Sequence, residues 1–162
     1  DGIRASVASR GLGDVYKRQV LLTWPLIPFG AYVRLKNAGL SCPDWPLCHG
    51  QLIPPMEFHT LVEYSHRLNA SLLMLFVIAL FVLCWVRYRD EKSILIFSGA
   101  AVGLVVSVAI LGGITVLTEL AWWVRLIHLT LAELLIGTIV GVVWLAFSPK
   151  VLNSANLRPI NT

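Results

Sequence analysis

Three long apolar runs dominate this chain, at residues 62–86, 94–117 and 122–147. A helix needs about 20 predominantly apolar residues to cross the hydrocarbon core of a bilayer, and each run is that long. A fourth, shorter run covers residues 20–34. Backbone groups in lipid must be satisfied within the segment, which favours helices. We therefore predict an all-α integral membrane protein, a four-transmembrane-helix bundle over residues 20–148.

The composition supports a membrane protein without a soluble domain. Hydrophobic residues make up 57% of the chain and charged residues 14%, with a mean hydropathy of +0.75. These values lie outside the range of soluble globular domains. We expect the lipid bilayer as a partner and no nucleic acid. The polar residues 149–162 are predicted to be a tail or a linker to a further segment.

Residues 1–19 do not fit the rest of the chain. They are polar, show no periodicity and stop abruptly at an apolar run. A signal peptide would place its charges before a complete apolar stretch and a small-residue cleavage site. The segment resembles translated sequencing-adapter sequence, and we predict that it is non-native. The helix over 20–34 would then lack its true start, and Pro25 and Pro28 already strain it.

The distribution of cations predicts the orientation in the membrane. Lys and Arg gather in residues 86–93 and after residue 147, whereas 37–61 contains neither. Positively charged loops remain on the cytoplasmic side, which places 86–93 and the C-terminus in the cytoplasm. Four cations near the opposite face run against this rule and need another explanation: Arg34, Lys36, Arg67 and Arg125.

The long outer loop, residues 36–61, contains Cys42 and Cys48. In an oxidising compartment such a pair is a natural disulfide, which either stiffens the loop or exchanges electrons with a partner. A zinc site that adds His49 and His59 is a third alternative, although it lacks the usual close spacing of paired ligands. The remaining cysteine, Cys84, is predicted to lie in the core.

Two histidines occupy matched positions on two apolar segments. Glu63 and His66 are three residues apart and share one helix face, and His128 lies in the last apolar run. At about 1.5 Å per residue, both histidines fall within roughly 10 Å of the outer surface. Because the two helices run in the same direction, the imidazoles can hold one planar cofactor between them. The alternative is that each histidine only bonds a neighbouring helix.

Iron porphyrin is the cofactor that this arrangement favours, because imidazole is its common axial ligand. Arg34, Arg67 and Arg125 would lie at the same face, where guanidinium groups can pair with haem propionates. An ionisable group at the mouth of a membrane helix is a functional candidate, so Glu63 is one as well, although it could also pair with an arginine. Glu133 is about 140° around the helix from His128 and receives no role.

Five segments together resemble the amino-terminal half of heme A synthase, from about residue 29 to about residue 135. In chain order they are GAYVRLKNAGLSCPDWPLCHG, QLIPP, EYSHRLNA, LGGITVL and VRLIHLTLAE. The resemblance implies a bacterial inner-membrane oxidoreductase that converts haem O to haem A by oxidising a ring methyl to a formyl. It also implies that haem O synthase and the terminal oxidase assembly are partners.

The resemblance implies roles for particular residues. His66 and His128 would be the haem-iron pair, and Glu63 the acidic residue near the methyl group that is oxidised. Cys42 and Cys48 would be the loop pair of the bacterial branch, able to form a disulfide. The site would lie near the outer face of the membrane.

The length of the chain departs from the family pattern. The usual form has two similar bundles and this chain has one, so it is either a fragment or a half-size form that assembles as a homodimer. Two other functions stay open. A cytochrome b-like electron-transfer bundle would use both histidines without catalysis. A membrane thiol–disulfide enzyme would use the cysteine pair alone.

Overall fold

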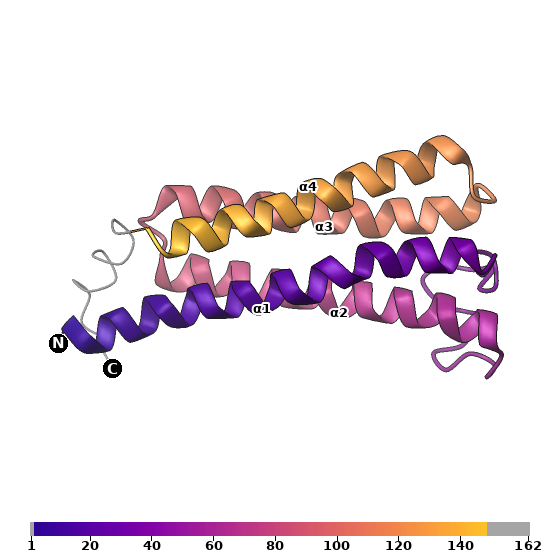
Figure 1. Ribbon diagram of the computed structural model, residues 1–162, viewed down its shortest axis with the longest axis horizontal. Helices are drawn as coiled ribbons and strands as arrows, with labels where there is room; N and C mark the ends of the chain where they lie inside the picture. Colours follow the sequence, from indigo (N-terminus) through magenta and orange to yellow (C-terminus); the bar gives the residue numbers. More distant parts are fainter. Residues whose placement is uncertain (1, 149–162) are drawn as a thin grey trace.

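The computed structural model describes residues 2–148, with side chains from Asp14 onward, and it consists of four helices (Figure 1). The three helices after the long loop are long and apolar enough to cross a membrane. Among the described residues, α1 does not reach the same hydropathy with as few charges. The prediction of an all-α bundle is confirmed, and the predicted tail lies outside the described residues. The helices are α1 (Gly2–Leu35), α2 (Phe58–Arg87), α3 (Lys92–Leu117) and α4 (Trp122–Ala146).

Three helices begin earlier than the apolar runs, and for α3 the difference is only two residues. Helix α2 starts at Phe58, four residues before the run at 62–86, because hydropathy marks lipid contact and not the first helical hydrogen bond. Helix α1 continues back to Gly2, through the segment predicted to be non-native. A helical conformation does not test the origin of that segment, so its non-native origin stays a prediction.

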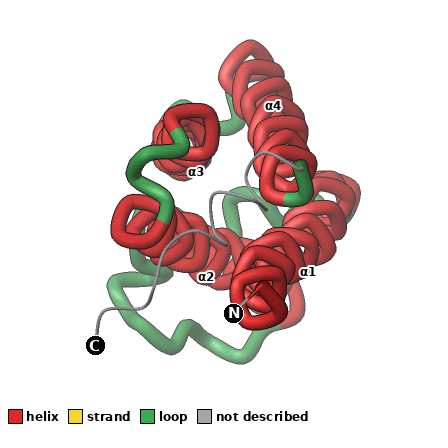
Figure 2. The backbone as a smooth tube through the Cα atoms, turned by 90° about the vertical axis from the view of Figure 1, so that its left-hand side faces the viewer, coloured by secondary structure: helices red, strands yellow, loops and turns green. Residues whose placement is uncertain are grey.

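The four helices form a square in cross-section (Figure 2). Helices α1 and α3 each contact both α2 and α4, whereas α2 and α4 do not contact each other within the described helices. Helices α2 and α4 therefore run in the same direction on opposite corners. The α1–α2 and α3–α4 connections meet at one end, and the α2–α3 connection lies at the other (Figure 1).

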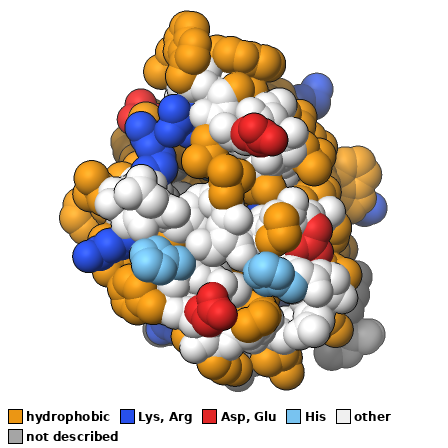
Figure 3. Space-filling view, turned by 90° about the vertical axis from the view of Figure 1, so that its right-hand side faces the viewer, with side chains coloured by type: hydrophobic (Ala, Val, Ile, Leu, Met, Phe, Trp, Pro, Cys, Tyr) orange, Lys and Arg blue, Asp and Glu red, His pale blue; other side chains and the backbone are white. Residues whose placement is uncertain are grey.

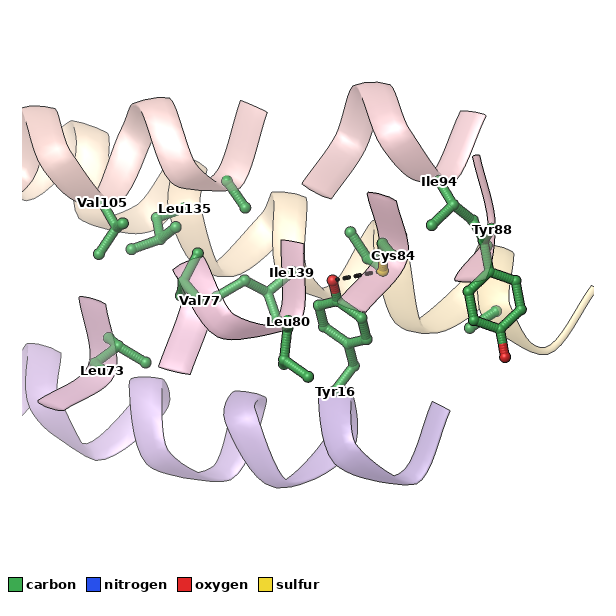
Figure 4. Packing of buried hydrophobic residues seen from close by; sticks show 13 residues of the cluster. Tyr16, Leu73, Val77, Leu80, Cys84, Tyr88, Ile94, Val105, Leu135 and Ile139 are labelled. Carbon is green, nitrogen blue, oxygen red and sulfur yellow. Dashed lines mark hydrogen bonds between the residues drawn. The ribbon is translucent and has the colours of Figure 1, made fainter. Parts of the chain in front are cut away.

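The apolar core fills the half of the bundle that is remote from the long loop (Figure 4). Leu73, Val77 and Leu80 recur at helical spacing on α2 and pack toward α4 residues that include Ile139. Cys84 is fully buried, as the sequence predicts, and its sulfur lies 3.3 Å from the Tyr16 hydroxyl. The opposite half of the bundle carries the polar candidates.

Candidate functional site

A disulfide joins Cys42 and Cys48 in the loop between α1 and α2. The two Cα atoms are 4.6 Å apart, within the normal range for a disulfide, and both cysteines are buried. The prediction of a disulfide is confirmed. The zinc alternative fails because the two sulfurs are bonded to each other, and His49 and His59 are both exposed. A redox role for the pair stays a prediction.

The disulfide loop, which we define as residues 38–51, is organised around Asp44. The Asp44 carboxylate accepts hydrogen bonds from the backbone N–H groups of His49, at 2.6 Å, and Gly50, at 2.8 Å. Both donors have positive φ, at 55° and 68°, which turns the chain back toward Cys48. The Gly50 N–H is the main cause that holds the pKa of Asp44 below its ordinary value. The carboxylate therefore stabilises the turn as an anion.

Glu63 and Arg67 tie this loop to helix α2. One Glu63 oxygen accepts the Cys42 N–H at 2.8 Å, and the other accepts a hydrogen bond from Arg67. Arg67 also donates to three backbone carbonyls, those of Cys42 at 2.8 Å, Asp44 at 2.6 Å and Leu47 at 2.9 Å. Every one of these loop groups lies within or beside the disulfide ring. We call Glu63 and Arg67 the loop clamp.

The sequence leaves open the alternative that Glu63 pairs with an arginine, and the ion pair between Glu63 and Arg67 confirms it. Sequence reasoning missed, however, that both residues hold the loop. The sequence placed Glu63 and Arg67 beside a cofactor, whereas the structure directs both side chains to the loop. Glu63 is only 4% exposed, and the Arg67 side chain is 14% exposed. The signal was present in their spacing, because residues four apart on a helix are neighbours and an acid followed by a base at that spacing forms a pair.

His66 on α2 and His128 on α4 lie at the end of the bundle that carries the loop. His66 is eight residues after the first residue of α2, and His128 is six residues after the first residue of α4. The Nδ1 atom of each is buried and has no hydrogen-bond partner. Buried polar nitrogens normally find a partner, so two such atoms at one end of the bundle indicate a ligand site.

A glycine on a neighbouring helix makes room for each imidazole. A Cβ atom on Gly30 of α1 would lie 3.1 Å from His66 Cε1, and one on Gly112 of α3 would lie 3.5 Å from His128 Cε1. Sequence reasoning also missed these glycines. A contact between helices leaves no mark beyond the small residue itself, which is common in membrane helices for packing reasons alone.

The remaining candidate residues, Arg34, Arg125 and Glu133, differ in their burial and in their hydrogen-bond partners. Arg34 is exposed near the end of α1, and Arg125 is half-buried with an Nε atom that has no partner. Glu133 is exposed on α4, away from the histidines. Charged and histidine side chains gather at the end of the bundle that carries the loop (Figure 3). The structure thus places the two histidines and the three arginines at the same end of the bundle.

Comparison with known proteins matches residues 19–161 to a family described as cytochrome oxidase assembly protein. A heme A synthase from Geobacillus thermodenitrificans is 30% identical over 133 residues, which is 81% of this chain and 41% of that protein. The heme A synthase of Geobacillus kaustophilus is 32% identical over 75% of the chain and 38% of its own length. The heme A synthase of Alkalihalophilus pseudofirmus is 30% identical over 83% of this chain and 46% of its own length.

The chain spans less than half the length of these curated relatives. The family match nevertheless covers all four apolar runs, the disulfide loop and both histidines. A match over that much of the chain is decisive for the family. The chain belongs to the cytochrome oxidase assembly protein family, as a homologue of the heme A synthases.

Proposed function

We propose that this bundle holds haem between His66 and His128 and is the site at which a heme A synthase oxidises the ring methyl of haem O to a formyl. The observation that carries the proposal is a pair of half-buried imidazoles, each with a buried Nδ1 atom that has no hydrogen-bond partner, on two of the described helices whose Cα atoms do not come within 8 Å of each other. An iron porphyrin takes imidazole as an axial ligand from each side. When bound, the haem iron supplies the oxidising power that side chains lack.

The residues around the imidazoles fit a flat group. Gly30 and Gly112 present bare backbone to the two rings, so α1 and α3 can each approach one imidazole closely and help to hold it in place. Phe29 meets the His66 ring edge-on, with centroids 5.6 Å apart, and this contact helps to fix the ring's orientation. The chain thereby orients both ligating side chains before haem arrives, which lowers the entropy cost of binding.

The arginines divide into two roles under this proposal. Arg34 and Arg125 are the propionate partners, because Arg34 is exposed at this end and Arg125 has an unpartnered buried Nε atom. Arg67 lies at the same end of the bundle, but its main role is to hold the loop. Its guanidinium already donates hydrogen bonds to three loop carbonyls and to Glu63. Charge-assisted bonds of this kind explain cations that the positive-inside rule does not.

Glu63 is the proposed catalytic carboxylate. It lies one turn before His66 on α2 and is almost fully buried, so its negative charge is poorly screened. Such a charge would stabilise positive charge that develops at the macrocycle edge, and the carboxylate could accept the proton of an incoming water. The disulfide beside it could relay electrons or only stiffen the loop.

The proposed setting is a bacterial cytoplasmic membrane, with the haem site near the outer face and the C-terminus in the cytoplasm. Haem O is the substrate, and the proposed partners are haem O synthase and the terminal oxidase assembly. A second bundle, from a longer chain or from a homodimer, would complete the enzyme, because the relatives are more than twice as long as the matched region.

One observation favours a second candidate, a cytochrome b-like electron-transfer bundle without its own catalysis. Both Glu63 oxygens hold the loop, through the Cys42 N–H and the Arg67 guanidinium, which gives the carboxylate a structural role that needs no catalysis. Pigment extraction separates the two functions. Haem A or a hydroxylated haem in membranes that carry the protein indicates the synthase, and unmodified haem alone indicates the electron-transfer bundle.

We expect His66→Ala and His128→Ala each to abolish the low-spin bis-histidine haem spectrum of the purified protein, because each removes one axial ligand. The matched control is His59→Ala, which removes an exposed histidine in the first turn of α2 and should leave the spectrum unchanged. Unchanged spectra and haem stoichiometry in both ligand variants would refute the proposed site.

A further inference from the structure

The disulfide loop extends across the end of the bundle as far as α3. A Cβ atom on Gly39 would lie 3.3 Å from the Leu120 side chain in the α3–α4 connection. A Cβ atom on Gly113 of α3 would lie 2.7 Å from the Trp45 ring. The indole therefore rests directly on the α3 backbone, where no residue larger than glycine fits without displacing it.

The Trp45 ring lies beside the part of α3 that faces His128. Gly112, the neighbour of Gly113, approaches the His128 ring. These two adjacent glycines of α3 thus connect the indole to the candidate axial ligand at one depth in the bundle. Trp45 is still 43% exposed, so part of its aromatic surface remains available for a further contact.

The loop clamp determines where the indole sits. Arg67 donates to the carbonyls of Asp44 and Leu47, which bracket Trp45 and Pro46 in the chain. Cys42 and Cys48 close the ring on either side, and Glu63 holds the Cys42 N–H. Because these anchors flank Trp45 closely, loss of the guanidinium would free the segment that carries the indole.

We propose that Trp45 forms part of the wall of the haem site and contacts the macrocycle, and that Arg67 is the positioning residue that keeps it there. This inference rests on the proposed function, since it assumes haem between His66 and His128. A planar indole suits a planar macrocycle, and an aromatic contact of this kind typically changes affinity about three- to tenfold. The sequence predicted Arg67 as a propionate partner. Under this inference Arg67 is instead the residue that positions Trp45.

The test is titration of the full chain in detergent with haemin, followed by Soret absorbance and Soret circular dichroism. We expect Trp45→Ala to weaken haemin binding about three- to tenfold and to alter the Soret dichroism, and Trp45→Phe to retain most of the affinity. Gly113→Ala should reproduce the Trp45→Ala result from the opposite side, because the new methyl displaces the indole. Arg67→Lys should do the same through the loop, since Lys cannot reproduce the planar fork of donors.

Gly103→Ala is the matched control, because a Cβ atom there meets nothing within 4 Å. Unchanged affinity and dichroism in Trp45→Ala and Gly113→Ala, with binding lost in His66→Ala, would overturn the inference and leave the proposed function standing. Altered haemin binding in the Trp45 variants, with unchanged haemin binding in both histidine variants, would overturn the proposed function. The contact between Trp45 and the macrocycle would then still stand. Absence of saturable haemin binding by the unaltered chain would overturn both.

Discussion

Glu63 serves two partners with one carboxylate. Its oxygens are divided between the Cys42 N–H and the Arg67 guanidinium, and the residue is 4% exposed. The residue that the resemblance implicates in oxidation is therefore also the residue that fastens the loop, and the two roles need to be separated by experiment.

Glu63→Gln separates them, because glutamine keeps the size and one acceptor oxygen but removes the charge. Arg67 retains its three loop carbonyls in this variant, so we expect haem binding to persist. We expect oxidation to stall, with accumulation of haem O or its alcohol and a loss of about 3 kcal/mol in transition-state stabilisation. Chromatography of haem extracted from membranes gives the composition.

Glu57→Gln is the control for this experiment, since Glu57 precedes α2 and its side chain makes no capping hydrogen bond. A normal yield of haem A from Glu63→Gln would end the idea of charge stabilisation. Loss of all bound haem would instead assign Glu63 to the loop clamp alone.

At the scale of the helix, α2 directs adjacent side chains to two different structures. Glu63 and Arg67 are four residues apart and share the face that meets the loop, whereas His66 is offset by about 100° from Arg67 and packs against α1. The α1 backbone can approach His66 closely because Gly30 has no side chain there. One helical turn therefore couples the loop to the candidate haem site.

Gly30→Ala should disturb the His66 ligand more than Gly112→Ala disturbs His128. The added methyl would be 3.1 Å from the imidazole at Gly30 but 3.5 Å at Gly112, which is an ordinary contact. We expect weaker haemin binding and a shifted Soret band in Gly30→Ala only. Alanine also raises helix propensity by about 1 kcal/mol, so thermal stability alone is a poor readout.

Gly103→Ala measures that propensity gain without crowding, because its Cβ position is open. If Gly30→Ala binds haemin with the affinity and spectrum of Gly103→Ala, the close approach of α1 does not position His66.

At the scale of the molecule, the polar candidate residues lie at one end of the bundle (Figure 3). The apolar core lies toward the other end (Figure 4). The disulfide loop and the α3–α4 connection share the polar end, and residues 88–91 connect α2 to α3 at the opposite end. An orientation with the disulfide outside the cytoplasm agrees with the cation distribution and with the oxidising conditions that a disulfide requires.

Thiol labelling in sealed cells tests this orientation. A cysteine introduced by Met56→Cys, at a position of the outer loop that is 74% exposed, should react with a membrane-impermeant maleimide from outside. A cysteine introduced by Arg89→Cys should react only after the membrane is opened, and the buried Cys84 is the internal control. Labelling of the introduced loop thiol from the cytoplasmic side alone would reverse the proposed topology.

The sequence by itself determined the class of fold and the identity of the main side chains. Bilayer thickness sets the length of an apolar run, so the spans at α2, α3 and α4 could be predicted without a structure. The cysteine pair was predictable because a short polar loop outside the membrane holds both residues. His66 and His128 stood out because an ionisable group in an apolar run needs a reason to be there.

The tertiary structure alone decided which groups meet. Helical periodicity states which face a residue occupies, but it does not state which helix or loop lies opposite that face. For this reason the sequence assigned Glu63 and Arg67 to a cofactor, while the folded chain directs them to loop carbonyls and to the Cys42 N–H. The contact between Trp45 and Gly113 joins residues 68 positions apart, and only packing across the end of the bundle brings them together.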